Sequence, residues 1–242
     1  MTAATFNAYR LPGLFLAELE ADSEWWHCYE LKSPLYDAGP LSTNPGSKNR
    51  FALVNGVPPG TLARPSYYIG QTERSALFET ILRHNNPDPN GDVRLRPDQL
   101  ANRGLVQLRL KTPMPVIMLH RPMRDRLGIT PDDPLDATID LLTRTSVYAA
   151  THEFAGSLDA QCRADPTVSS GLPALMWTSR QINTDLVAVL FTPPNDDDVW
   201  EVGPTIVLDT DAGRDRINAA LAAGRMQLAG DLDFTLPPGA GP

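Results

Sequence analysis

Five side chains of this sequence are of types that could carry chemistry together: Arg10, Arg50, Tyr68, Glu79 and Ser179. A carboxylate can stabilise positive charge that develops in a reaction, and guanidinium groups bind phosphates through paired hydrogen bonds. Each type also has an ordinary explanation, because an arginine at a strand start, a tyrosine in a strand and a glutamate on a helix are more often structural or solvated. Composition and spacing alone therefore favour the ordinary explanation.

The glutamate lies in a predicted strand–helix unit. Residues Ser66–Gly70 are aromatic and β-branched, which is typical of a short half-buried strand. Thr72 is a good helix N-cap, and apolar residues at i,i+4 spacing follow it. The helix is expected to run until the turn at 85–87, which places Glu79 two turns into it.

The rest of the chain mixes strands and helices without regular βαβ alternation, so the sequence predicts an α+β fold with mixed or antiparallel central sheets and surrounding helices. We expect one domain over 1–236 and a flexible tail over 237–242. Strands are expected at 6–11, 105–110, 116–119, 171–177, 185–191 and 205–208, and helices within 135–162 and 214–223.

Composition limits the function classes. The net charge of −8 and pI near 4.9 argue against direct binding to nucleic acid, which needs clustered lysine and arginine. Cys28 and Cys162 form no CxxC pair, which suits a reducing compartment. The N-terminus shows no secretory pattern, and the longest apolar run, 186–191, is too short to cross a membrane. We therefore expect a cytoplasmic protein without membrane association.

Several standard motifs are absent from the sequence. It has no G-x-S-x-G element, no G-x-G-x-x-G element and no P-loop. The four histidines, His27, His84, His120 and His152, are far apart and are interpreted as ordinary residues rather than metal ligands. The acidic turn at 195–198 lacks the spacing of a calcium loop. We expect no metal site.

Two segments around Glu79 carry a resemblance to a known family. Tyr68 and Glu79 are eleven residues apart, and Ala76-Leu77 precedes the glutamate. Upstream lies Asn49-Arg50-Phe51, which is similar to a Gly-Arg-Trp/Phe element. In this order the segments resemble the RES-domain family, which is named for an Arg, a Glu and a Ser.

Two further segments extend the resemblance over residues 6–192. Tyr9-Arg10-Leu11 is similar to the family's opening Tyr-Arg, and 171–180, which ends in Trp177-Thr178-Ser179-Arg180, is similar to its Gly-(Leu/Ile)-x-Tyr-x-Ser-Arg element. The sequence departs from the family in the long loops between Arg10 and Arg50 and between Arg50 and Tyr68.

The resemblance implies a fold like that of ADP-ribosyltransferases and a toxin that degrades NAD+. Such proteins break the bond between nicotinamide and ribose and pass ADP-ribose to water or phosphate, with NAD+ as substrate and no cofactor. Glu79 would then stabilise the oxocarbenium-like transition state. Arg50 and Arg10 would hold the pyrophosphate or the attacking phosphate, and Tyr68 would stack on the nicotinamide or ribose. Ser179 would bind the ribose or orient Glu79.

The resemblance also implies a neutralising partner, an antitoxin with an Xre-type helix-turn-helix or an immunity protein. A homodimer is compatible with the sequence, and so is delivery of the toxin into rival cells. Two other functions stay open: mono-ADP-ribosyl transfer onto a macromolecule, and a non-catalytic binding module. The acceptor, the partner's identity and the role of residues 209–242 stay undecided.

Overall fold

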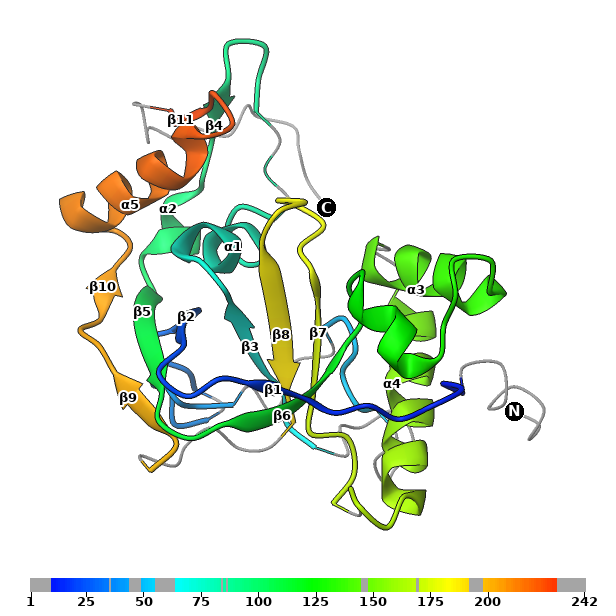
Figure 1. Cartoon of the computed structure of the whole chain (residues 1–242). Helices are drawn as coiled ribbons and strands as arrows, with labels where there is room; N and C mark the ends of the chain where they lie inside the picture. The colour runs from blue at the N-terminus through cyan, green and yellow to red at the C-terminus, as the bar shows by residue number, and fades with distance from the viewer. Residues whose placement is uncertain are drawn as a thin grey trace.

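A curled nine-stranded sheet organises the chain (Figure 1). The computed structural model describes residues 10–34, 36–43, 49–54, 64–83, 85, 87–144, 148–168, 170–191 and 198–229. The strand order within them is β1-β6-β7-β8-β3-β2-β5-β10, with β9 also paired to β5. The α+β class predicted from the sequence, with mixed or antiparallel central sheets and surrounding helices, is confirmed. The strands are β1 (Ala17–Leu19), β2 (Glu24–Glu30), β3 (Tyr67–Gly70), β4 (Asp92–Val93), β5 (Arg103–Leu110), β6 (Met114–Met118), β7 (Ala174–Thr178), β8 (Leu186–Leu190), β9 (Trp200–Val202), β10 (Ile206–Val207) and β11 (Gln227–Leu228).

Helices cover the sheet in two places (Figure 1). In one, α3 (Pro134–Arg144) and α4 (Tyr148–Ala164) pack against β7 and β8, and Phe154, Trp177 and Val189 belong to one buried cluster there. In the other, α1 (Glu73–Phe78), α2 (Pro97–Leu100) and α5 (Asp211–Ala222) form a second cluster with Leu105 of β5. A short 3-10 helix covers Met123–Leu127, and β4 pairs with β11 in a separate two-stranded sheet.

Strands β2 and β3 are neighbours in the sheet but separate soon after they meet. β2 pairs with β5 along seven residues, whereas its described pairing with β3 is the single register pair Trp26↔Gly70. β3 continues its regular pairing on the other side, with four residues of β8. The backbones of β2 and β3 therefore diverge from Gly70 toward Ser66, and this divergence opens a cleft.

The sequence predicted most elements but not all of their bounds. The strands expected near 105–110, 116–119, 171–177, 185–191 and 205–208 are present, and two helices occupy the region 135–162. The helix that starts after Thr72 is shorter than expected, because it ends at Phe78 and a series of turns follows. Glu79 is consequently its C-cap rather than a residue within the helix.

The first part of the chain differs more from expectation. The strand expected at 6–11 falls mostly outside the described residues, and the described part of it, Arg10 and Leu11, is not in a strand. Trp25, Trp26 and Tyr29 belong to the long strand β2, which was not predicted from the sequence. The tail expected at 237–242 and the acidic turn up to residue 197 also lie outside the described residues. Within the described parts of the chain, no helix has both the length and the apolar composition needed to span a bilayer.

Candidate active site

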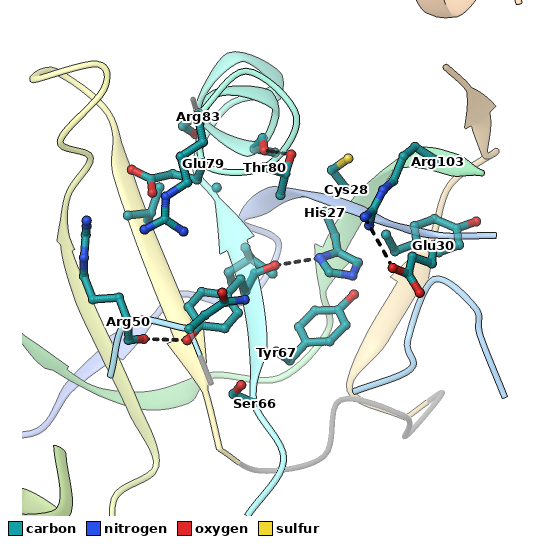
Figure 2. A pocket seen from close by; sticks show the side chains of 18 of the residues that line it. His27, Cys28, Glu30, Arg50, Ser66, Tyr67, Glu79, Thr80, Arg83 and Arg103 are labelled. Atoms are coloured by element: carbon teal, nitrogen blue, oxygen red, sulfur yellow. Dashed lines mark hydrogen bonds and ion pairs between the residues drawn. The ribbon is translucent and has the colours of Figure 1, made fainter. Parts of the chain in front are cut away.

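The cleft between β2 and β3 is the candidate site (Figure 2). One end of the cleft is lined by Arg50, Glu79, Arg83 and Trp177, and the other by His27, Glu30, Tyr67 and Arg103. Tyr68 and Gly70 of β3 lie between the two ends. Three of the predicted residues, Arg50, Tyr68 and Glu79, thus line one cavity although 29 positions separate the first from the last.

Glu79 reaches the cleft because β3 turns directly into α1. Thr72 caps the helix by accepting from the backbone N–H of Ser75, and the Ser75 hydroxyl in turn accepts from the N–H of Thr72. Gly70 permits this close turn, since a Cβ there would lie 2.5 Å from Oγ of Ser75 and 2.6 Å from N of Ala76. The predicted cap and glycine exit therefore set the position of the glutamate.

Ser179 meets Glu79 from the end of β7. Its hydroxyl donates to Oε1 of Glu79 at 2.7 Å and accepts from the backbone N–H of Gln181 at 3.2 Å. The backbone N–H of Ser179 is itself held by the carbonyl of Asp185 at 2.8 Å. Ser179 is 1% exposed and lines a neighbouring hollow rather than the cleft. This geometry suits a residue that orients the glutamate.

Arg50 lies in a non-regular segment that several contacts fix in place. The Tyr68 hydroxyl donates to the Arg50 carbonyl, and the Phe51 N–H donates to Thr151 on α4 at 3.2 Å. Phe51 has φ of 63°, a left-handed conformation that is unusual for a bulky residue, and its ring packs edge-on against Trp177 with centroids 4.9 Å apart. Such conformations persist where the surroundings impose them and are concentrated at functional sites.

Positive charge is concentrated around the glutamate. Arg50 is 2% exposed, and burial lowers its pKa; the Glu79 carboxylate raises that pKa, while the nearby Arg83 and Arg180 lower it further. Arg83 is placed over the ring of Tyr148, 5.1 Å from its centroid. Among the described residues, the cations Arg83 and Arg180 and the Glu79 carboxylate therefore all act on the Arg50 guanidinium, in a protein whose overall charge is −8. This local field favours an anionic ligand.

The other end of the cleft is aromatic. The His27 ring lies between Tyr67, with centroids 4.1 Å apart, and Tyr29, at 5.8 Å. Glu30 and Arg103 form an ion pair of 3.3 Å next to it (Figure 2). Burial lowers the pKa of His27 to about 4, and Arg103 acts in the same direction. His27 is thus a neutral ring at neutral pH.

The structure does not place Arg10 with the other four predicted residues. Arg10 is exposed and lines a separate hollow with Gln161. The neighbouring Leu11 is held on α4, where its N–H donates to Gln161 Oε1 at 3.1 Å and its carbonyl accepts from Gln161 Nε2 at 3.0 Å. These two bonds direct this part of the chain over α4 and away from the cleft.

Sequence reasoning missed two residues of the cleft. Arg83 follows Glu79 by four positions, a spacing that brings side chains together on a helical turn, and this signal was available. His27 was interpreted as an ordinary histidine because the four histidines are far apart in the sequence, and strand β2 was not predicted. Its position could not have been inferred without the pairing of β2 with β3. No group of three or more metal-binding side chains occurs among the residues that the structure describes.

Comparisons with known proteins give little further guidance. No model of a protein family matches the chain, and no curated protein matches it. Among solved structures, one match is a chain from the crystal structure of the M. tuberculosis MbcT-MbcA toxin-antitoxin complex. The two chains are 10% identical, the match covers 84% of this chain and 89% of that one, and the TM-score is 0.47. A likeness of this size carries no argument about fold or function.

Proposed function

We propose that this protein is an NAD+-degrading enzyme that breaks the bond between nicotinamide and ribose. The observation that carries the proposal is the Glu79 carboxylate, which Ser179 holds at 2.7 Å in a cleft that also contains Arg50 and Arg83. The order of the motifs that resemble the RES-domain family supports the same reaction, with NAD+ as the substrate.

The reaction suits these side chains. When the C1′–N bond breaks, its electron pair moves to the pyridinium nitrogen and the nicotinamide leaves as a neutral molecule, so no strong general acid is needed. The difficult part is the positive charge that develops on the ribose, and Glu79 would stabilise it electrostatically or through a ribose hydroxyl. Ser179 would keep the carboxylate in one orientation. Arg50, Arg83 and Arg180 would bind the pyrophosphate.

The acceptor completes the reaction at C1′. A water oxygen attacks and releases a proton, which gives ADP-ribose; an oxygen of inorganic phosphate gives ADP-ribose 1″-phosphate. The same arginines that would bind the pyrophosphate would also attract free phosphate. Mono-ADP-ribosyl transfer onto a macromolecule is the alternative outcome. Tyr68 would contribute by fixing the Arg50 carbonyl and presenting its ring to the cleft.

The first experiment measures NAD+ consumption by the purified protein with and without inorganic phosphate. We expect rapid loss of NAD+. Glu79→Gln should lower kcat by about 100- to 1000-fold, because it removes the negative charge that stabilises the developing cation. The matched control is Glu73→Gln on the same helix, whose side chain pairs with Arg216 at 3.1 Å outside the cleft. It should change kcat by less than about twofold.

The products separate the three acceptors. Free ADP-ribose indicates water, a phosphate-dependent product indicates phosphate, and label retained on macromolecules indicates a transferase. Full NAD+ consumption by Glu79→Gln would refute the assignment of Glu79. A wild-type protein that consumes no NAD+ would favour the binding module.

We also infer a neutralising partner, an antitoxin or immunity protein. If the cleft degrades NAD+, expression of the chain alone should deplete cellular NAD+ and stop growth. Co-expression of the partner should restore both. Growth arrest that persists in Glu79→Gln would separate toxicity from NAD+ loss.

A further inference from the structure

His27 closes the gap that opens between β2 and β3. Its Nδ1 lies 2.6 Å from the carbonyl oxygen of Tyr68, so a side chain replaces the backbone bond that a continuous ladder would supply (Figure 2). A carbonyl oxygen can only accept a hydrogen bond, so Nδ1 carries the proton. The ring is neutral, and its other nitrogen, Nε2, is therefore a hydrogen-bond acceptor.

This acceptor is available to a ligand. His27 lines the cleft and keeps 9% of its surface exposed. Among the described residues, the ring makes one hydrogen bond, to the carbonyl of Tyr68, so no donor there is bonded to Nε2. The contacts with Tyr67 and Tyr29 fix the plane of the ring. The direction in which Nε2 accepts is thus set before any ligand arrives.

We propose that Nε2 of His27 accepts a hydrogen bond from an N–H or O–H group of the substrate, and that this end of the cleft selects for such a donor. The inference rests on the proposed function, under which the donor is either the carboxamide of nicotinamide or a ribose hydroxyl. The neighbouring Glu30 carboxylate is also an acceptor, and it is paired with Arg103. Substrates that place a carboxylate at Nε2 would lack the donor and leave the nitrogen unsatisfied.

Two variants separate substrate binding from support of the strand. His27→Asn keeps a side-chain amide that can donate to the Tyr68 carbonyl but has no atom at the position of Nε2, whereas His27→Phe loses both. We expect both variants to raise KM for NAD+ by roughly tenfold, with a much smaller change in kcat. The control is Glu73→Gln, since the Glu73 side chain pairs with Arg216 outside the cleft and its substitution should leave KM unchanged. Wild-type KM in His27→Asn would overturn the proposal, because a purely structural role would be rescued by asparagine.

Substrate analogues identify the donor. Nicotinic acid adenine dinucleotide carries a carboxylate in place of the carboxamide. If the carboxamide is the donor, wild-type kcat/KM should be roughly tenfold lower for this analogue than for NAD+, and His27→Asn should remove the difference. If the donor is a ribose hydroxyl, His27→Asn should slow both substrates equally.

A measurement without turnover keeps the two proposals separate. Nitrogen NMR of the histidine rings reports the tautomer directly, and His27→Asn assigns the signal among the four histidines. We expect a neutral ring protonated at Nδ1, and a shift of the Nε2 resonance when nicotinamide or ADP-ribose is added. A wild-type protein that shows this shift but consumes no NAD+ would refute the proposed reaction alone. No shift with either probe would overturn the His27 proposal.

Discussion

Arg124 and Arg50 are both almost fully buried, at 4% and 2% exposure, but their surroundings differ. Arg124 donates to the carbonyl of Leu119 at 2.5 Å and to Oδ1 of Asp136 at 2.7 Å, and it forms a second ion pair with Asp140 at 2.7 Å. Its charge is compensated by two carboxylates.

Within the part of the chain that the structure describes, the charges that act on Arg50 are the Glu79 carboxylate and the cations Arg83 and Arg180. Burial and these cations lower the pKa of Arg50. Burial of a charge is therefore not by itself evidence of function. A buried charge indicates a binding site when a ligand of opposite charge would stabilise it better than its protein neighbours do.

The largest expected effect is on stability, and it tests the structural role of Arg124. Arg124→Met should lower the free energy of unfolding by about 3 kcal/mol, because it removes the buried guanidinium from Asp136 and leaves that carboxylate with the half-exposed Arg121. For a chain of this size that corresponds to a fall in Tm of roughly 10 °C. Chemical denaturation measures the change. NAD+ turnover by the folded variant should be unchanged, and a variant as stable as the wild type would show that the cluster contributes nothing.

The matched substitution at Arg50 should lower activity and have little effect on stability. Arg50→Met removes a charge that its surroundings disfavour, so the free energy of unfolding should fall by no more than about 1 kcal/mol. The loss of a phosphate-binding group should lower kcat/KM for NAD+ by about 100-fold. The same two assays are used for both variants. If Arg50→Met lowered the free energy of unfolding as much as Arg124→Met and left kcat/KM unchanged, the two arginines would have the same role.

Local signals in the sequence explain what could be predicted of the fold. Thr72 and Gly70 specify the turn from β3 into α1, and the alternation of residues 105–110 specifies β5, because each depends only on neighbouring residues. The end of α1 was misjudged because apolar residues at i,i+4 spacing continue to Leu82. In the structure Ile81 and Leu82 are buried although they lie in turns and not in a longer helix.

The candidate site was harder to predict because it depends on pairing over long distances. Glu79, Arg50 and Tyr68 were selected by their types and by a family resemblance, and the structure brings them together. Arg10 was selected in the same way, but the hydrogen bonds between Leu11 and Gln161 hold it elsewhere. His27 could not be selected, since its role exists only where β2 and β3 separate.

The buried basic group of His27 differs from both arginines, because burial makes the His27 ring lose its proton. Its pKa is about 4 in the folded protein and has an ordinary value of 6.5. Between these values the unfolded chain binds a proton that the folded protein does not, so stability falls as pH decreases. From about pH 7 to pH 5.5 we expect His27 to account for a loss of about 1 kcal/mol of unfolding free energy.

Denaturation of the wild type and of His27→Phe over this pH range tests this prediction. Other titrating groups contribute equally to both proteins, so the difference between their unfolding free energies reports His27 alone. The advantage of the wild type over the variant should shrink as pH decreases, and a constant difference would mean that His27 stays in one protonation state in both the folded and the unfolded chain.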